Sequence, residues 1–420
     1  MVEQSIYRRL FWPVYAPSIL FGVAGGATVP VFVVAAMNLG ASAALAALVV
    51  ALLGAVGLAT TVQAGRLIDR VGDRRAMLAA TAVAAVCDLG SIAALLWRGQ
   101  GAGRAALALF IVANLVQAPA SMVWGLARQA FTAEHAHPHE RGRAMTGLGG
   151  TMRIGALVGP LLGGLLLLRL PLWTVYLLSV GCATLAVVIL YVPSLGGRIE
   201  AVAVPVSPSR GAGRDATGGR LDVDWTRVAL AGVAICTLAV ARVAQAVLLQ
   251  LWGVHQGLDG SRISLVIAVG AAVEIVLMFP GGALKDRVGR AAILVACLAI
   301  YGLGYLLLVP LSQLWGIAGM VAAVVVMAVG NGLGAGVNMT IGADLSPSVG
   351  RARFLGYWAL FTGSGALGGP LVISALVKLA SIPAAVAAVG AVTLAGAAWT
   401  ILLAPRMALP RHLGRQPSSH

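Results

Sequence analysis

The sequence predicts an all-helical membrane protein whose twelve transmembrane helices form two similar six-helix bundles. Three observations lead to this fold class: the composition, a series of twelve long apolar segments, and polar motifs that repeat in the two halves of the chain. Hydrophobic residues make up 60% of the 420 residues and charged residues only 10%, whereas soluble proteins average about 45–50% and about 25%. That little charge cannot cover a water-exposed surface, and it also excludes a disordered chain or a coiled coil.

The twelve apolar segments each reach the roughly 20 residues that a helix needs to cross the hydrocarbon core of a bilayer. Gly40 and Pro310 mark two joins that are too short for loops, so tight turns are expected there. The expected spans are 12–36, 42–64, 76–97, 105–126, 144–168 and 172–193, then 228–251, 263–284, 291–310, 314–337, 355–377 and 382–404.

The basic residues predict the orientation of these spans, because short cytoplasmic loops retain Arg and Lys. With the N-terminus inside, 23 of the 29 basic residues lie on the cytoplasmic side and 5 on the other, while Arg242 alone lies within a span. Both termini are therefore expected in the cytoplasm, in a multi-pass protein of the cell (inner) membrane. The basic residues form no stripe with aromatic residues, so the net charge of +15 predicts no nucleic-acid partner.

A polar segment divides the chain into two parts. Residues 194–226 are rich in Gly, Pro, Ser and Arg, which predicts a flexible cytoplasmic linker. The expected organisation is an N-terminal six-helix bundle over residues 1–193, the linker, a C-terminal six-helix bundle over residues 227–405, and a cytoplasmic tail over residues 406–420. We expect the protein to be a monomer.

Two sequence motifs occur once in each half. The first reads Gly-x-Leu-x-Asp-Arg-x-Gly, between spans two and three and again between spans eight and nine, with an offset of 217 residues. The second reads Gly-x-x-x-Gly-Pro, in the fifth and eleventh spans, with an offset of 210 that Glu134 and Asp344 share. Two polar motifs in the same order predict two fused bundles, an arrangement typical of secondary transporters with a substrate site between the repeats.

The first motif resembles the signature loop of the major facilitator superfamily, and twelve spans with a linker after the sixth agree with that family along the whole chain. The resemblance implies a cytoplasmic gate in which Asp69 faces a helix N-terminus or an arginine, while Gly65 and Gly72 allow a close helix approach and a tight turn. Asp73 replaces the basic residue that is usual there, and the arginines of the loop can alternatively serve only as topology charges. The implied gate residues are Gly65, Asp69, Arg70, Gly72 and Arg74, with Gly282, Asp286, Arg287 and Gly289 in the second half.

The fifth span carries a glycine pattern that resembles the one associated with antiporters of this superfamily. Small residues let helices pack closely, and a proline kinks a helix because it removes one backbone hydrogen bond; generic close packing is the alternative. In the fourth span the family often places an arginine before Gln-Gly, but this chain has Asn114, Gln117 and Ala118 there, so a mechanism that uses that arginine is not expected. The pattern consists of Gly155, Gly159, Pro160, Gly163 and Gly164.

Three ionisable residues, Asp88, Arg242 and Glu274, lie well inside predicted spans. An unpaired charge at the centre of a membrane costs at least about 2.5–3.5 kcal/mol, so such residues are candidates for function. At 1.5 Å per residue, Arg242 lies about 14 Å and Glu274 about 16 Å from the outer ends of their helices, so the two can pair. Either they form a permanent ion pair, or Glu274 takes up and releases a proton during transport.

Asp88 is a second candidate for proton coupling, with hydrogen bonding inside its own bundle as the alternative. Arg242 can instead hold an anionic substrate, and Gln245 follows it on the same helical face. The fourth and tenth spans surround the cavity in the family that the sequence resembles. The expected cavity residues are therefore Asn114, Gln117, Arg242, Gln245 and Asn331.

Neither a metal site nor a cofactor is expected. The four cysteines lie singly in apolar segments, and His135, His137 and His139 fall in a polar loop, where a solvated loop is the simpler interpretation. A membrane transferase would need clustered carboxylates or a His–Asp pair, but the 14 acidic residues are dispersed, so an enzyme is not expected. The sequence also has no Gly-Lys-Ser loop that would hold ATP.

The sequence therefore predicts a secondary active transporter that exports small amphipathic compounds, such as drugs or metabolites, in exchange for protons. Two alternatives remain within transport. The segment Glu274-Ile-Val-Leu-Met278 resembles the eighth span of sugar exporters, which favours sugar efflux, and import of a small metabolite is compatible with the same fold. The expected partners are a small-molecule substrate, protons and the lipid bilayer.

Overall fold

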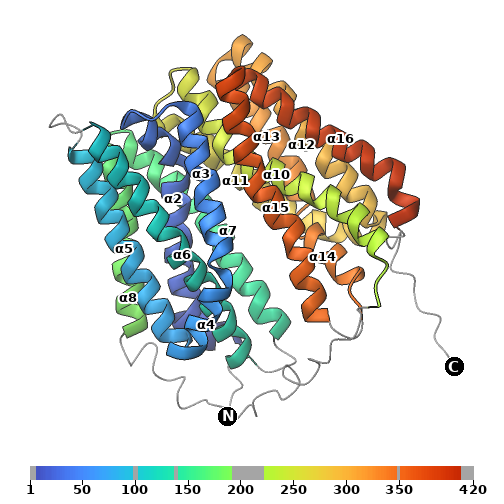
Figure 1. Ribbon diagram of the computed structural model, residues 1–420, viewed down its shortest axis with the longest axis horizontal. Coiled ribbons are helices and arrows are strands. Elements are labelled where there is room, and N and C mark those ends of the chain that lie inside the picture. Colours follow the sequence, from blue (N-terminus) through green and yellow to red (C-terminus); the bar gives the residue numbers. More distant parts are fainter. Residues whose placement is uncertain (1–5, 98–102, 137–140, 192–221, 348–350, 408–420) are drawn as a thin grey trace. The chain divides into compact units, whose positions relative to one another are not determined.

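The computed structural model describes residues 6–97, 103–136, 141–191, 222–347 and 351–407, and these parts of the chain are helices joined by short turns (Figure 1). Eleven of the described helices are long and apolar enough to cross a membrane. A bent pair, α3 (Ala43–Ala59) and α4 (Thr61–Val71), completes the predicted twelve if it counts as one span. Only the backbone is described at residues 6, 133, 141–143, 146, 279, 281–283, 285–287, 351–353, 355 and 356.

The second span is bent by 48° at Thr60, between α3 and α4, and its side chains explain the bend. The Thr60 hydroxyl donates to the carbonyls of Val56 (2.7 Å) and Gly57 (3.1 Å), and the Thr61 hydroxyl donates to Gly57 (3.2 Å). Threonine hydroxyls that bond back to the preceding turn compete with the helical ladder and bend helices. At the other end, the Ser42 hydroxyl caps α3 by accepting from the Leu45 amide (3.2 Å).

The first of two compact units contains the described residues up to Tyr191, together with Gly253–Ala268. In it, α2 packs against α7 and α8, α5 packs against α6 and α8, and α3 and α4 pack against α6. Its helices are α1 (Ile6–Leu10), the π-helix η1 (Phe11–Tyr15), α2 (Ala16–Asn38), α3, α4, α5 (Asp73–Trp97), α6 (Gly103–His135), α7 (Arg141–Leu167) and α8 (Trp173–Tyr191).

The second unit contains the described residues from 222 to Trp252 and from Val269 to Met407. Here α12 packs against α13 and α16, as α5 packs against α6 and α8 in the first unit, which agrees with the repeat in the sequence. The helices are α10 (Trp225–His255), α11 (Gly260–Val288), α12 (Arg290–Trp315), α13 (Ile317–Leu333), α14 (Val337–Asp344), α15 (Arg351–Leu379) and α16 (Ile382–Met407).

Two boundaries differ from those that the sequence predicts. Pro310 lies inside α12, and the turn comes six residues later at Gly316, which has φ +58° and which an L-residue would rarely tolerate. The expected tenth span over 314–337 is also interrupted, because α13 ends at Leu333 and α14 begins only at Val337, after Gly336 in the left-handed region (φ +76°). The turn expected near Gly40 is present, with φ +100° at that glycine.

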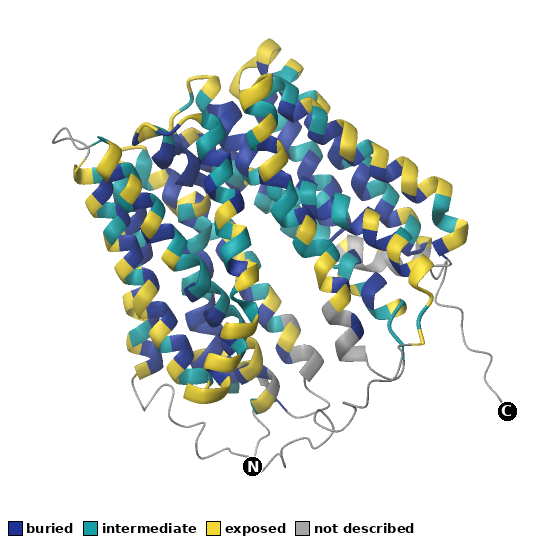
Figure 2. Cartoon of the chain, in the orientation of Figure 1, coloured by how far each residue is buried: buried dark blue, intermediate teal, exposed yellow. Residues whose placement is uncertain are grey.

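Many helix residues in both units are exposed (Figure 2), and large apolar side chains are among them. Val86 on α5 is 67% exposed, and Leu402 on α16 is 76% exposed. Water-soluble monomers rarely expose extended apolar surface. Exposed apolar side chains of this kind suit a lipid environment. Polar side chains instead form hydrogen bonds in the interior of each bundle.

Candidate functional site

Arg242 anchors a polar cluster inside the second unit. From α10 its Nε donates to Asn331 Oδ1 (2.7 Å), and its Nη2 donates to the carbonyl of Gly334 (3.2 Å). Gly334 lies in the interruption between α13 and α14, where the helical ladder leaves backbone carbonyls available. The broken helix thus supplies a neutral acceptor for a charge inside the membrane, and it brings together two of the predicted cavity residues, Arg242 and Asn331.

Gln245 and Glu274 belong to the same cluster. The buried Tyr301 of α12 donates its hydroxyl to Gln245 Oε1, and the charges of both Arg242 and Glu274 act on the Tyr301 hydroxyl. The backbone of Glu274 lies against Gly332 of α13, where an added Cβ would be 3.1 Å from the Glu274 carbonyl oxygen. The structure therefore gathers Arg242, Gln245, Glu274 and Asn331 around Tyr301.

Asp88 lies in a second polar cluster, in the first unit, and is only 1% exposed. Its carboxylate accepts from the Ser179 hydroxyl (2.6 Å) and from Gln117 Nε2 (3.2 Å). Asn114 also bonds inside this bundle, because its Nδ2 donates to the Phe110 carbonyl (2.8 Å) and to Ser91 Oγ (3.3 Å). Three predicted site residues are thus together, and Asp88 makes the internal hydrogen bonds that are the alternative to proton coupling.

The predicted gate motif forms the turn after α4. Gly72 has φ +83° and Gly289, its counterpart in the second half, has φ +97°, so both copies use the conformation that glycine permits. Asp69 and Arg70 are exposed on α4. A Cβ added at Gly65 would meet no heavy atom within 4 Å, so the close helix approach expected there is not present. Only the backbone is described at Gly282, Asp286 and Arg287, so the contacts of the second copy of the motif lie outside the described residues.

Arg74 caps the end of α8. Its Nε and Nη2 both donate to the carbonyl of Leu190 (3.0 and 2.6 Å), close to the last residue of that helix. A cation that bonds the unsatisfied carbonyls at a helix C-terminus also interacts favourably with the helix dipole. Arg74 therefore does more than label the topology, which was the alternative interpretation of this residue.

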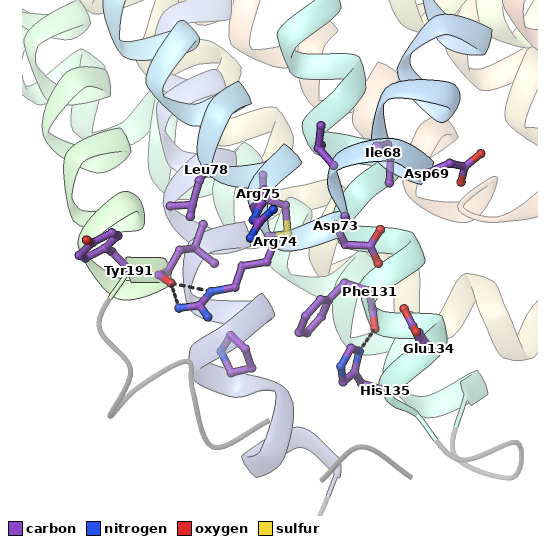
Figure 3. A pocket seen from close by; sticks show the side chains of 15 residues that line it. Ile68, Asp69, Asp73, Arg74, Arg75, Leu78, Phe131, Glu134, His135 and Tyr191 are labelled. Carbon is purple, nitrogen blue, oxygen red and sulfur yellow. Dashed lines mark hydrogen bonds between the residues drawn. The ribbon is translucent and has the colours of Figure 1, made fainter. Parts of the chain in front are cut away.

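A cavity of about 810 Å³ lies beside Arg74 at the ends of α4, α5, α6 and α8 (Figure 3). Its floor is apolar, with Ile68, Met77 and Leu190 among its residues, and the side chains at its rim are charged. The charged and titratable residues that line it are Asp69, Asp73, Arg74, Arg75, Glu134 and His135.

The two halves differ in charge at one repeated position near this cavity. The offset of 217 places Arg290 where the first half has Asp73, and the offset of 210 places Asp344 where it has Glu134. Arg290 Nε and Asp344 Oδ2 form an ion pair at 3.2 Å, whereas Asp73 and Glu134 are both acidic and line the same cavity. This difference in charge is visible in the sequence only when the two repeats are aligned by these offsets.

The glycine pattern of α7 makes a close crossing with α2. A Cβ on Gly155 would overlap the backbone of Gly22, and one on Gly159 would lie 2.5 Å from the carbonyl carbon of Gly26. Pro160 lies inside α7 directly after this contact. Small residues that allow two backbones to touch are the usual basis of close helix packing in membranes.

The end of the pattern contacts the beginning of α11, within the first unit. Ser261 Oγ donates to the carbonyl of Gly164 (2.9 Å), and an added Cβ at Gly164 would lie 2.9 Å from Leu265 Cγ. At Gly163 an added Cβ would make only ordinary contact, 3.5 Å from the Ala27 carbonyl oxygen. The pattern therefore serves two different contacts, one with α2 and one with α11.

Arg128 follows the predicted fourth span, 105–126, and is one of the 23 basic residues expected on the cytoplasmic side, but it lies in a helix and not in a loop. Helix α6 continues past the predicted end at residue 126 as far as His135, so Arg128 lies within it and is only 9% exposed. Its guanidinium lies over the ring of Trp124 (5.1 Å), which in turn stacks on Phe21 of α2 (4.0 Å between centroids). No pattern in the sequence distinguishes this arginine from those of the loops.

Comparison with known proteins agrees with this architecture. The profile of the Major Facilitator Superfamily matches residues 16–227 and again residues 228–418. No curated protein sequence matches the chain significantly. Among solved structures, a POT family transporter in complex with 5-aminolevulinic acid has a TM-score of 0.71 at 12% identity, covering 96% of this chain and 97% of its own.

The xylose transporter XylE from E. coli, in an inward open conformation, has a TM-score of 0.70 at 12% identity, with 98% of both chains covered. A D-xylose-proton symporter gives 0.69 at 12% identity, with 98% of this chain and 100% of its own covered. At such low identity these similarities establish the fold alone. Because the family profile covers nearly the whole chain, in both halves, this protein belongs to the Major Facilitator Superfamily and is a multi-pass membrane transporter.

Proposed function

We propose that this secondary transporter exports small amphipathic compounds in exchange for protons, by alternating access. The observation that carries the proposal is the crossing of α2 and α7, where Gly22 faces Gly155 and Gly26 faces Gly159. The residues on α7 belong to the pattern that resembles antiporters of the superfamily. Pro160 follows the contact directly and interrupts the hydrogen-bond ladder there, which provides a place for α7 to bend.

Glu274 is the proposed proton carrier. Asn331 and Gly334 satisfy donors of Arg242 with neutral oxygens, so the arginine keeps its position while Glu274 gains or loses a proton. The backbone of Glu274 packs against Gly332, the residue after Asn331, so Glu274 lies next to the residue that binds Arg242. Ionisable residues inside membrane-spanning helices are typical of proton pathways in transporters.

Proteoliposomes test both parts of the proposal. A panel of amphipathic drugs and metabolites is enclosed, a pH gradient is imposed, and release is followed with the unchanged protein, with Glu274→Gln and with the control Asp224→Asn. Asp224 is an exposed residue at the start of α10 that caps the helix. We expect release to follow the gradient and Glu274→Gln to remove that dependence, while Asp224→Asn keeps it.

Release that ignores the gradient for every compound, together with an unchanged Glu274→Gln variant, would contradict proton coupling. Sugars form a separate arm of the panel, because the segment from Glu274 to Met278 resembles the eighth span of sugar exporters. Gradient-driven accumulation on the opposite side would favour import of a small metabolite. The direction assumes that both termini face the cytoplasm, as the 23 cytoplasmic basic residues predict for the cell (inner) membrane.

A further inference from the structure

Arg128 is a buried cation whose donors are not all used. Neither its Nε nor its Nη1 has a hydrogen-bond partner in the described part of the chain, and both atoms are inaccessible to solvent. The adjacent Trp124 Nε1 is also buried without a partner there. A buried charge without an acceptor is strongly unfavourable, and most buried polar groups are paired. Three buried donors at one place therefore indicate an acceptor that the described part of the chain does not supply.

At the equivalent position in the second half, the side chain has hydrogen-bond partners. The offset of 210 places Asn338 where the first half has Arg128. Asn338 Nδ2 donates to Thr362 Oγ1 (3.1 Å), and Asn338 Oδ1 accepts from Trp358 Nε1 (2.9 Å). A neutral side chain with both ends paired is thus compatible with this fold. Because the fold does not need an unpaired arginine here, Arg128 is better explained by a ligand than by packing.

Aromatic residues lie on the same face of α6 as Arg128, and two of them line the cavity. Trp124, Arg128, Phe131 and His135 are spaced along one face of α6. Phe131 and His135 line the 810 Å³ cavity, and Trp124 packs in the same apolar cluster as Ile68, Met77 and Leu190, which also line it. Arg128 therefore lies beside a stacked aromatic pair, about one helical turn before Phe131, which lines the cavity.

The acidic residues nearest along these helices do not neutralise Arg128. Asp69 of α4, Asp73 of α5 and Glu134 of α6 line the cavity, yet among the described residues no carboxylate forms an ion pair with Arg128. Arg74 and Arg75 also line the cavity, so its lining carries charges of both signs. What distinguishes Arg128 from these arginines is that two of its donors are buried and unused within the described part of the chain.

We propose that Arg128 and Trp124 bind the anionic group of the transported molecule, so that the substrate class is an amphipathic oxyanion with a flat apolar body. Guanidinium groups bind carboxylates and phosphates through charge-assisted hydrogen bonds, and Nε and Nη1 of Arg128 are two donors that no described residue uses. The stacked rings of Trp124 and Phe21 would contact the apolar body. That the bound molecule is also the transported one rests on the proposed function.

Binding to purified protein, without any gradient, tests this site independently of coupling. Calorimetry compares three compounds with one naphthalene body: 1-naphthoate, 1-naphthyl phosphate and 1-naphthylmethylammonium. We expect at least one anion to bind at least tenfold more tightly than the ammonium compound. Arg128→Asn, which gives the first half the residue of the second, should weaken that anion ten- to hundredfold. Arg104→Asn is the matched control, an exposed arginine on the first turn of the same helix, and should change nothing.

Unfolding of the same variants separates binding from packing. Removing an unpaired buried charge should leave the unfolding temperature of Arg128→Asn unchanged or raise it, whereas a purely structural arginine would lower it. Equal affinity for the ammonium compound, an Arg128→Asn variant that binds the anions normally, or one that is less stable without losing affinity would each overturn the assignment. Anion binding combined with transport that ignores a pH gradient would instead refute proton coupling and leave this site standing.

A lipid phosphate offers the same chemistry as a soluble oxyanion, so the titration is repeated in nanodiscs with and without phosphatidylglycerol. For a soluble substrate we expect the affinity of the bound anion to change less than threefold when the anionic lipid is added. If the lipid abolishes binding in the unchanged protein, the site belongs to a lipid headgroup and the substrate assignment is overturned.

Discussion

The two halves of this transporter build the same helix crossing from different residues. In the first half glycine faces glycine, with Gly22 against Gly155 and Gly26 against Gly159, so that backbone touches backbone. In the second half, a Cβ on Gly365 of α15 would overlap the carbonyl oxygen of Cys236 on α10, whereas one on Gly369 would lie 3.4 Å from the Val240 carbonyl oxygen. The repeat therefore conserves the path of the helices, and the close backbone contact extends over two glycines of the pattern in the first half but only one in the second.

Adding one methyl group at equivalent positions breaks this comparison most directly. Gly159→Ala places a Cβ about 2.5 Å from the backbone of Gly26, which cannot move aside, so we expect the free energy of unfolding to fall by about 3 kcal/mol. Gly369→Ala creates only an ordinary contact and should change it by less than about 0.5 kcal/mol. Denaturant unfolding in detergent measures both.

Gly163→Ala is the control on α7, because its Cβ would lie 3.5 Å from Ala27 and should be tolerated. Similar losses for Gly159→Ala and Gly163→Ala would mean that helix flexibility, and not close crossing, explains the pattern.

The carboxylates inside the two halves, Asp88 and Glu274, are expected to differ in role: Asp88 stabilises the fold and Glu274 carries the proton. Asp88 is held by Ser179 and Gln117, so Asp88→Ala leaves two buried donors unpaired and should lower the free energy of unfolding by about 2–3 kcal/mol. Gradient-driven transport per folded molecule should remain. Glu274→Gln should do the reverse, with little change in stability and a loss of coupling. A coupling defect in Asp88→Ala, measured in proteoliposomes, would move the proton site to the first half.

The sequence predicts the helices well because the hydrophobic pattern that defines a span is local. It does not predict the interruptions. The bend at Thr60 depends on hydroxyls that could equally have pointed elsewhere, and the gap between α13 and α14 is a run of small residues in an otherwise uniform apolar segment. Both breaks result from interactions within and between helices, and hydropathy does not record those interactions.

The sequence predicts which residues belong to the candidate site better than it predicts which of them contact one another. Burial in an apolar span singles out Arg242 and Glu274, but their arrangement around Tyr301 follows from the helix break at Gly334. Arg128 was expected in a loop because an arginine just after an apolar span is normally a loop residue, whereas α6 continues to His135, nine residues beyond the predicted end at 126. The unpaired state of Arg128 depends on which helices pack around it, which no local pattern reveals.

Changes at the ion pair of Arg290 and Asp344, near the start of α12, should have an intermediate effect on the free energy of unfolding. Arg290 is largely buried and bonds Asp344, so Arg290→Gln should lower the free energy of unfolding by about 2 kcal/mol. In the first half, Asp73→Arg gives Glu134 an oppositely charged neighbour and should raise it by up to about 1 kcal/mol. Thermal unfolding at low and high salt checks both, since the gain should shrink when salt screens the new pair. A loss of stability in Asp73→Arg would show that the carboxylate of Asp73 makes favourable interactions of its own, and that the first half does not merely lack an ion pair like that of Arg290 and Asp344.

The smallest effect on the free energy of unfolding is expected at Arg74. Its measurement distinguishes a helix cap from a residue that acts in the gate. Position 291, its equivalent by the offset of 217, is an alanine, so only the first half caps the end of its sixth span in this way. Arg74→Gln should lower the free energy of unfolding by about 1 kcal/mol, while the exposed Arg75→Gln should have no effect. If Arg74 is a cap, the transport rate per folded molecule stays constant. If the rate changes and stability does not, Arg74 acts in the gate, because a gating contact is made in only one conformation and contributes little to the stability of the resting fold.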